Sequence, residues 1–332
     1  MTPLRVVVLA GGLSHERDVS LRSGRRVAEA LTSVGVETSL RDVDAGLMGD
    51  LQRDRPDCVI PLLHGETGED GSLREILELV GVPYVGSKPA AARMAFDKPI
   101  AKQVVAGAGV RSPASFALPA DTFRELGAAD VMASLVARLG LPLVVKPGRG
   151  GSALGVSVVR RADELPAAMV SCFSYGPVAL VERCVSGVEV AVAVLDQGSG
   201  PRALPAVEIR PDGGVYDYTA RYTAGSTEFF VPARLDPAVA ADCARVAEQA
   251  HRALGLRDLS RSDLIVDSDG TVWFLEVNVA PGMTETSLVP LSIEAAGLDL
   301  GSALAELARA AAVRPSSSSQ DTTRDAGDRL TT

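Results

Sequence analysis

Residues 273–288 read Trp273-Phe-Leu-Glu276-Val-Asn278-Val-Ala-Pro281-Gly282-Met-Thr-Glu-Thr-Ser287-Leu288. The apolar and aromatic run 272–277 is typical of a buried strand, although it contains Glu276. Side chains alternate between the two faces of a strand, so Glu276 and Asn278 leave the same face next to each other. Neighbouring carboxylate and amide oxygens just before a Pro-Gly turn are typical ligands of a hard cation such as Mg²⁺.

A preceding strand supplies a third oxygen ligand. Asp263 opens the apolar run 263–267, and the turn Asp267-Ser-Asp-Gly270 joins this run to the next strand in a hairpin. The hairpin brings Asp263 beside Glu276 and Asn278. A single acid on a strand is usually a solvated surface residue. Three converging acid or amide groups in so apolar a segment instead favour Mg²⁺ that holds the phosphates of a nucleotide.

Composition narrows the class of protein. The 332 residues suffice for two or three domains with their own cores. The formal net charge of -9 argues against nucleic acid as a partner. No apolar run is long enough to cross a bilayer, and the four cysteines form no CxxC pair, which is typical of a reducing compartment. We therefore expect a cytoplasmic protein that binds neither nucleic acid nor membrane.

Strands and helices alternate over the first ninety-odd residues. The expected strands are 5–9, 37–42, 58–63 and 84–85, and the expected helices are 19–34 and 71–80. This order predicts an open, mostly parallel α/β sheet. Ligands bind such sheets at the carboxyl ends of strands, where two polar clusters fall: Ser14, His15, Glu16 and Arg17, then His64, Glu66, Glu69 and Asp70. Each residue alone is usually a cap or a solvated loop residue, but two clusters at one sheet edge indicate a site.

A glycine-rich loop follows in the middle of the chain. Strands 143–146 and 155–159 flank Lys146-Pro-Gly-Arg-Gly-Gly-Ser152, and a helix over 96–106 has Asp97 as N-cap and Lys98 in its first turn. Glycines let backbone N–H groups approach an anion, and the two lysines add positive charge. The loop is neither a P-loop nor a dinucleotide fingerprint, because a strand rather than a helix follows it. Bare hairpin turns can look alike, so its pairing with Lys98 and the acidic hairpin favours phosphate binding.

The rest of the chain continues with strands, a long loop and helices. The expected strands are 114–118, 178–181, 187–195 and 203–209, and the expected helices lie within 121–139 and at 236–254, 293–296 and 300–313. The polar, aromatic loop 215–230 is long enough to be a structured lid. From Pro315 almost nothing is apolar, which predicts a disordered tail.

Four segments in this order resemble the D-alanine–D-alanine ligases of the ATP-grasp superfamily. They are Leu9-Ala-Gly-Gly-Leu-Ser-His-Glu-Arg-Asp-Val-Ser20, His64-Gly-Glu-Thr-Gly-Glu-Asp-Gly71, Tyr216-Asp-Tyr-Thr-Ala-Arg-Tyr222 and Asn278-Val-Ala-Pro-Gly-Met-Thr-Glu-Thr-Ser-Leu-Val-Pro290. The third segment is similar to the start of the family's ω-loop. The resemblance covers Arg5 to about Val313. It implies an α/β fold with an N-terminal open parallel α/β sheet domain followed by a two-lobed ATP-grasp fold. The implied divisions are an N-terminal substrate domain (1–96), a central lobe (97–185), a C-terminal lobe (186–314) and the tail (315–332).

The resemblance also implies a reaction. ATP phosphorylates the carboxylate of a first D-alanine, and the amino group of a second D-alanine attacks the acyl phosphate to give D-alanyl-D-alanine for peptidoglycan precursors. The cofactors would be ATP and two Mg²⁺ ions, with Mn²⁺ as a possible replacement, and the enzyme would be a cytoplasmic homodimer. The implied metal ligands are Asp263, Glu276 and Asn278. The implied ATP contacts are Lys98, Lys146 and Arg221 on phosphates, Glu182 on the adenine amino group and Glu189 on the ribose.

Further residues are implied for the amino acid substrates. Glu16 would pair with the ammonium of the first D-alanine, with His64 nearby, and Ser287 and Leu288 would seat the second D-alanine. Arg261 and the backbone N–H of Gly282 would form an oxyanion hole. Glu16, Ser152 and Tyr222 would form a hydrogen-bonded triad that ties three parts of the chain around the site.

The chain departs from the family pattern at five positions, none of them an implied metal or oxyanion residue. Gly150 and Ala153 replace an acidic residue and a serine of the glycine-rich loop, Arg221 replaces a lysine, and Ser262 and Val279 replace an apolar residue and a threonine. Two alternatives stay open. One is a different ATP-grasp ligase that makes a specialised dipeptide or depsipeptide, and the other is a non-catalytic nucleotide-binding protein. The first would differ at Glu16, Tyr222 or Ser287, and the second would lack a metal ligand.

Overall fold

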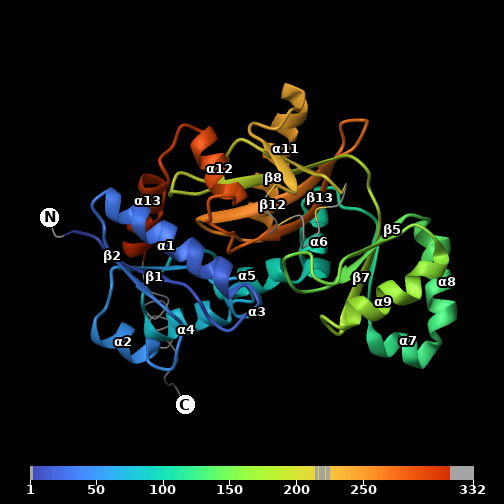
Figure 1. Ribbon diagram of the computed structural model, residues 1–332, viewed down its shortest axis with the longest axis horizontal. Helices are drawn as coiled ribbons and strands as arrows, with labels where there is room; N and C mark the ends of the chain where they lie inside the picture. Colours follow the sequence, from blue (N-terminus) through green and yellow to red (C-terminus); the bar gives the residue numbers. More distant parts are fainter. Residues whose placement is uncertain (1–2, 214–215, 217–220, 222–224, 315–332) are drawn as a thin grey trace, which may run out of the picture.

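The computed structural model describes residues 3–213, 216, 221 and 225–314 (Figure 1). Three sheets organise this part of the chain, in the strand orders β2-β1-β3, β4-β7-β5-β6 and β11-β10-β8-β12-β13, with β9 paired to β8. The first sheet is parallel and the other two are antiparallel. The α/β class and the parallel N-terminal sheet are thus confirmed. Tyr222 and the tail 315–332 lie outside the described residues.

The parallel sheet has β1 (Arg5–Leu9) between β2 (Glu37–Arg41) and β3 (Cys58–Pro61). Its helices are α1 (Arg17–Ser33), α2 (Leu47–Arg53), α3 (Glu66–Glu69) and α4 (Ser72–Val80). The strand expected at 84–85 is wrong: only one parallel bridge forms, between Val59 and Tyr84. Pro83 has no N–H to donate, and Gly86 leaves the extended conformation with φ +115°.

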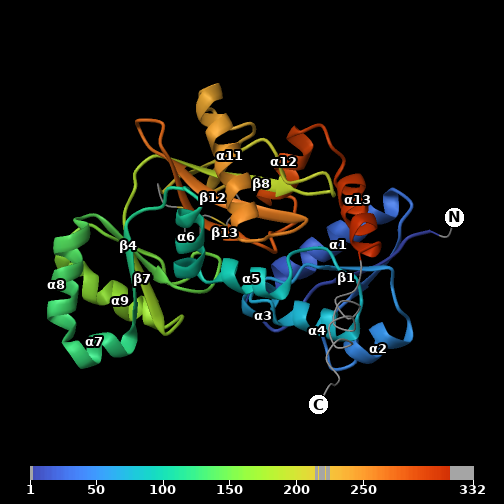
Figure 2. The same ribbon diagram turned by 180° about the vertical axis from the view of Figure 1, so that it is seen from behind.

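The second sheet consists of β4 (Ser115–Pro119), β5 (Leu143–Pro147), β6 (Ser157–Val159) and β7 (Val178–Arg183). The helices α7 (Ala120–Leu126), α8 (Ala128–Leu139) and α9 (Leu165–Phe173), with the 3₁₀ turn Ala162–Glu164, complete this lobe (Figure 2). The helix expected over 96–106 forms as α6 (Lys98–Gly107), and a helix that was not expected, α5 (Pro89–Phe96), precedes it. Asp97 separates them, because its side chain caps α6 by accepting from the N–H of Ile100.

The third sheet contains β8 (Val188–Leu195), β9 (Arg202–Ala203), β10 (Val207–Pro211), β11 (Thr227–Phe230), β12 (Leu259–Val266) and β13 (Val272–Asn278). Its helices are α11 (Pro237–Ala253) and α12 (Leu288–Ala295). The strand expected from Asp263 begins earlier, at Leu259, so Arg261 belongs to it. The helix expected from Ile293 begins at Leu288, because Pro290 fits the first turn of a helix.

The final helix, α13 (Leu300–Ala312), packs on the first sheet. One buried cluster joins Val6 of β1 and Ile60 of β3 to Leu304 and Leu307 of α13. Figure 1 shows this red helix beside the blue helix α1. The first and last parts of the described chain therefore share one core.

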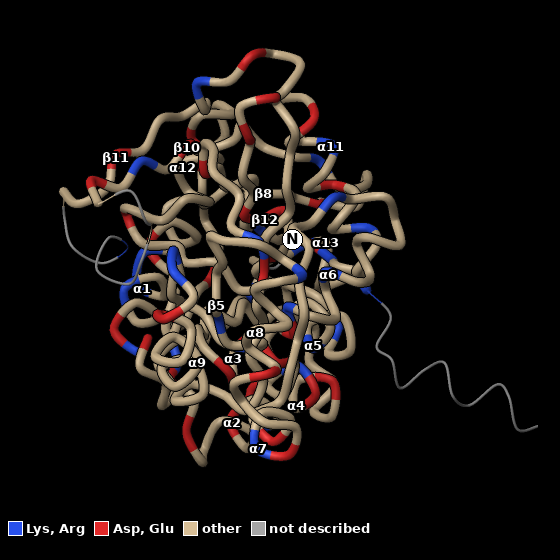
Figure 3. The backbone as a smooth tube through the Cα atoms, turned by 90° about the vertical axis from the view of Figure 1, so that its right-hand side faces the viewer, with Lys and Arg blue, Asp and Glu red and all other residues tan. Residues whose placement is uncertain are grey.

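Charged residues are spread over these elements. Basic and acidic residues are interspersed along the described chain (Figure 3). Within the described residues, no single helix is long and apolar enough to cross a membrane, and only α12 and α13 taken together pass that test, as a pair bent by 101°.

Candidate active site

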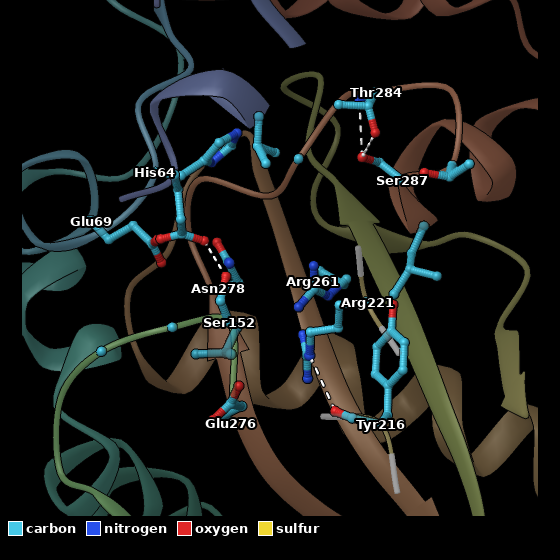
Figure 4. A pocket seen from close by; sticks show the side chains of 18 of the residues that line it. His64, Glu69, Ser152, Tyr216, Arg221, Arg261, Glu276, Asn278, Thr284 and Ser287 are labelled. Carbon is cyan, nitrogen blue, oxygen red and sulfur yellow. Dashed lines mark hydrogen bonds between the residues drawn. The ribbon is translucent and has the colours of Figure 1, made fainter. Parts of the chain in front are cut away.

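Two adjoining cavities, of about 370 Å³ and about 210 Å³, lie between the segments that follow β1 and β3, the glycine-rich loop and the β12–β13 hairpin. Lys98, Gly150, Tyr216, Arg221 and Glu276 line both of them. In Figure 4, Glu69, His64 and Ser152 flank one side of the larger cavity, and Arg221 and Tyr216 the other. Figure 4 also shows that Thr284 and Ser287 lie at one end and Glu276 at the opposite end.

The predicted hairpin forms and brings the three expected metal ligands to one face. Asp263 is opposite Glu276 and Arg261 is opposite Asn278 in the antiparallel register, with a bulge after Asp263. The guanidinium of Arg261 donates to both carboxylate oxygens of Asp263, at 2.7 and 2.8 Å. Burial opposes ionisation of Glu276, but the positive charges of Lys98 and Lys146 outweigh it and lower its pKa to about 2. Two carboxylates and an amide fit a hard divalent cation.

A buried ion-pair cluster adjoins this face. Glu182 of β7 places its two oxygens 2.6 Å from Nζ of Lys102 and 2.7 Å from Nζ of Lys146. Burial raises the pKa of Glu182, but the two ammonium groups outweigh it, so the net shift is downward. Burial lowers the pKa of Lys102 to about 8, against the attraction of Glu182. Both oxygens of Glu182, the residue expected to accept from adenine, thus face lysines here.

Lys102 is a residue that the sequence analysis missed. It follows Lys98 by four residues on α6, and this spacing puts both ammonium groups on one side of the helix. The signal was present in the sequence, but a second lysine on a helix is usually solvated. Only its ion pair with Glu182, which joins α6 to β7, distinguishes Lys102 from an ordinary solvated lysine.

The glycine-rich loop lies against the start of α6. The backbone N–H of Lys98 donates to Gly148 O at 2.9 Å, and its Nζ donates to Gly150 O and lies 3.7 Å from Oε2 of Glu276. Arg149 donates to Asp97 at 2.9 Å. Ser152 and Ala153 both have positive φ, 53° and 56°, which costs about 1–2 kcal/mol for each such non-glycine residue. The loop is therefore held in a strained conformation beside the predicted phosphate-binding lysines.

Ser152 connects this loop to the start of α1, because its hydroxyl donates to Oε1 of Glu16. Two members of the expected triad therefore meet, while Tyr222 lies outside the described residues. His64 is buried nearby, with Nδ1 2.9 Å from Ala280 O and Nε2 3.4 Å from Oγ of Ser23. Burial lowers the pKa of His64 despite the attraction of Glu16.

Glu69 brings a second carboxylate to the Glu16 side of the cavity. Its Oε1 accepts from the N–H of Gly65 at 3.0 Å. Burial, followed by repulsion from Glu16, raises the pKa of Glu69 from 4.5 to about 7. Glu69 is therefore a proton-binding group of the site near neutral pH.

This raised pKa predicts a pH-dependent stability difference. The folded protein holds the Glu69 proton more tightly than the unfolded chain, whose carboxyl has a pKa of 4.5. The stabilisation from this group is therefore fully present below pH 4.5 and is lost as the pH rises through about 7. Glu69→Gln removes this loss, so the variant should gain about 2–3 kcal/mol of unfolding free energy relative to the natural protein between pH 4.5 and pH 8. Urea unfolding of both proteins across this range measures the difference, and a constant difference would contradict the shift.

The remaining expected residues lie where the two cavities meet or at the far end. The guanidinium of Arg221 stacks 4.3 Å from the ring centroid of Tyr216, and its Nε donates to Tyr216 O at 3.3 Å. Burial raises the pKa of Glu189 to about 7. At the far end, Ser287 Oγ accepts from the N–H of Thr284 at 2.9 Å. The same Oγ lies only 2.9 Å from where a Cβ on Gly282 would be, so this approach requires glycine.

Comparison with known protein families shows which family the chain belongs to. The family model described as D-ala D-ala ligase N-terminus matches residues 36–87, and the one described as D-ala D-ala ligase C-terminus matches residues 105–309. The chain belongs to the D-alanine–D-alanine ligase family. It is 44% identical over 299 residues to the D-alanine–D-alanine ligase of Anaeromyxobacter dehalogenans, covering 90% of this chain and 93% of that one. It is 41% identical over 294 residues to that of Bordetella petrii, covering 89% and 88%.

Solved structures of related ligases have the same fold. The VanG D-Ala:D-Ser ligase from Enterococcus faecalis superposes with a TM-score of 0.79 at 29% identity, covering 92% of this chain and 98% of that chain. The D-alanine–D-alanine ligase from Bacillus anthracis complexed with ATP superposes with a TM-score of 0.77 at 28% identity, covering 94% and 97%. The resemblance drawn from four motifs and the ATP-grasp fold are both confirmed.

Proposed function

We propose that this D-alanine–D-alanine ligase family member uses ATP to join two D-alanines through an acyl phosphate. The observation that carries the proposal is the meeting of three features at two adjoining cavities. These are the Glu16–Ser152 contact, the Arg261–Asp263 pair and the Glu276–Asn278 strand face. Family membership and the ATP complex of the Bacillus anthracis relative support the same reaction.

The β12–β13 face is the proposed metal and phosphate end. Asp263, Glu276 and Asn278 would hold two Mg²⁺ ions, for which Mn²⁺ could substitute, and the bound ions would neutralise charge that develops during phosphoryl transfer. Lys98, Lys146 and Arg221 supply the positive charges around them. In the smaller cavity, Glu182 and Glu189 are the proposed adenine and ribose contacts. Contact with adenine would require Glu182 to share an oxygen that a lysine now binds.

The opposite end of the larger cavity is the proposed amino acid site. Glu16 would pair with the ammonium of the first D-alanine, with His64 nearby, and Ser287 and Leu288 would hold the second D-alanine. Attraction to Asp263 overcomes burial and raises the pKa of Arg261, so its guanidinium stays charged. Together with the N–H of Gly282, it would stabilise the oxyanion of the tetrahedral intermediate. Tyr222 would complete the Glu16–Ser152 triad.

The proposed context follows from the product. A D-alanyl-D-alanine ligase supplies peptidoglycan precursors, and we propose that it acts as a homodimer in the cytoplasm. The alternative is an ATP-grasp ligase that makes a specialised dipeptide or depsipeptide. Relatives that make the D-lactate ester resemble this family but have a histidine where this chain has Tyr222. A tyrosine is uncharged at neutral pH and gives the site no cation that would favour D-lactate over the ammonium form of D-alanine.

Product analysis of one reaction with ATP, Mg²⁺, D-alanine and D-lactate tests the proposal. At pH 7 we expect D-alanyl-D-alanine as the main product, with little or no ester. Glu16→Ala should lose activity, because the variant has no carboxylate for the first ammonium. Depsipeptide as the main product would refute the specificity, and the absence of any D-alanine-dependent phosphate release would refute the function.

A further inference from the structure

Arg74 of α4 is a charged side chain in an unusual environment. It is only 1% exposed and is the largest fully buried side chain among the described residues. Among the described residues, no carboxylate forms an ion pair with it. Its guanidinium instead donates to two backbone carbonyls, Gly68 O at 2.5 Å and Val279 O at 3.2 Å. Burying an unpaired charge is costly, so packing alone does not account for an arginine here.

The two carbonyls belong to motifs that are far apart in the sequence. Gly68 lies in α3, within the segment 64–71 that follows β3, and Val279 directly follows β13. The next carbonyl, Ala280 O, is 2.9 Å from Nδ1 of His64. Arg74 and His64 thus hold two successive carbonyls of the chain that leaves the metal-binding strand.

The other end of this segment is also fixed, by residues of helix α1. The N–H of Met283 donates to Oγ of Ser23 at 3.0 Å, and Arg26 donates to Thr284 O. The Pro281–Gly282 peptide therefore lies between anchored neighbours. The peptide unit before it is held through Ala280 O and the one after it through the N–H of Met283. Because each peptide unit is planar, holding both neighbours restricts the direction of the Gly282 N–H.

We propose that Arg74 is a positioning residue for ligation, which with His64 aims the Gly282 N–H at the developing oxyanion. This inference rests on the proposed function, in which that N–H is an oxyanion donor. Such a donor must lie about 2.7–3.1 Å from the place where the oxyanion forms. A small displacement of residues 279–283 would therefore weaken binding of the tetrahedral intermediate more than binding of the substrates.

Arg74→Met tests this role by removing the donors and keeping an apolar side chain. We expect kcat to fall about 10- to 100-fold, since a misplacement of about 1 Å can cost about 100-fold in rate. The KM values for ATP and the first D-alanine should stay within about twofold. The inhibition constant of a tetrahedral D-alanine phosphinate, measured with ATP, should rise by about the factor that kcat loses. Amide exchange at 279–284 should become faster.

Arg93→Met is the matched control. Arg93 lies on the neighbouring helix α5, is half-exposed and pairs with Glu75 of α4 at 3.5 Å, so its loss should change none of these measurements. If Arg74→Met does not fold, Arg74→Gln replaces it. Unchanged kcat and phosphinate affinity in a folded Arg74 variant would overturn the inference, whatever its Tm. If the natural protein makes no D-alanyl-D-alanine, the proposed function fails instead, and unchanged exchange at 279–284 in the variant would separately overturn the positioning.

Discussion

Glu276→Gln should fold normally and lose ligase turnover by roughly 100- to 1,000-fold, the range seen when one transition-state electrostatic contact is removed. Glu276 is opposite Asp263 and 3.7 Å from Lys98, and its lowered pKa of about 2 keeps it ionised at neutral pH. Glutamine has nearly the same shape but no charge, so it would hold a divalent cation and its phosphates much more weakly.

Steady-state phosphate release at saturating Mg²⁺ measures the effect, with circular dichroism to verify folding. Glu228→Gln is the control, because Glu228 lies on β11 of the same sheet but is half-exposed and pairs with Arg210. Its turnover should match that of the natural protein. Near-normal turnover in Glu276→Gln would exclude Glu276 as a metal ligand.

Glu182→Gln should lower the free energy of unfolding by about 3 kcal/mol at pH 7, because it leaves two buried ammonium groups without their carboxylate. The side chains of Lys102, Lys146 and Glu182 are 5%, 7% and 3% exposed, so water cannot replace the lost partner. The loss should shrink at pH 9.5. The pKa of Lys102 is already lowered to about 8, and a neutral amine costs little to bury.

Urea unfolding at both pH values measures this difference. Glu208→Gln is a suitable comparison, since the side chain of Glu208 is also buried, at 8% exposed, but its partner Arg234 is half-exposed and can be solvated. The decrease in the free energy of unfolding should be smaller for Glu208→Gln than for Glu182→Gln. Equal losses in the two variants would show that burial of the lysines is not the cause.

The site was predictable wherever its geometry is local in the sequence. Asp263, Glu276 and Asn278 belong to one hairpin, so strand periodicity and a turn motif were enough to bring them together. The glycine-rich loop and Lys98 were predicted from local signals as well, and Asp97 caps α6 as expected. The roles of these residues stay predictions, and so do the domain boundaries.

What could not be predicted depends on long-range packing. Lys102 meets Glu182 only because α6 packs beside β7, which lies eighty residues further along the chain. Arg74 is on a short helix whose sequence does not distinguish a buried arginine from an exposed one. The contact of Glu16 with Ser152 was expected only from the family resemblance, because no local pattern joins residues so far apart.

The packing of α13 on the first sheet has a consequence for synthesis on the ribosome. The strands β1 and β3 are made long before Leu304 and Leu307, which complete their core. At about 5–20 residues per second, translation of the intervening chain takes on the order of tens of seconds. During this time one apolar face of the nascent sheet lacks its cover, and a chaperone that binds apolar surface would have a target there. The chain between 279 and 284 is also anchored to Ser23 of α1, Arg74 of α4 and His64 after β3, so the nascent protein gains its complete active site only near the end of translation.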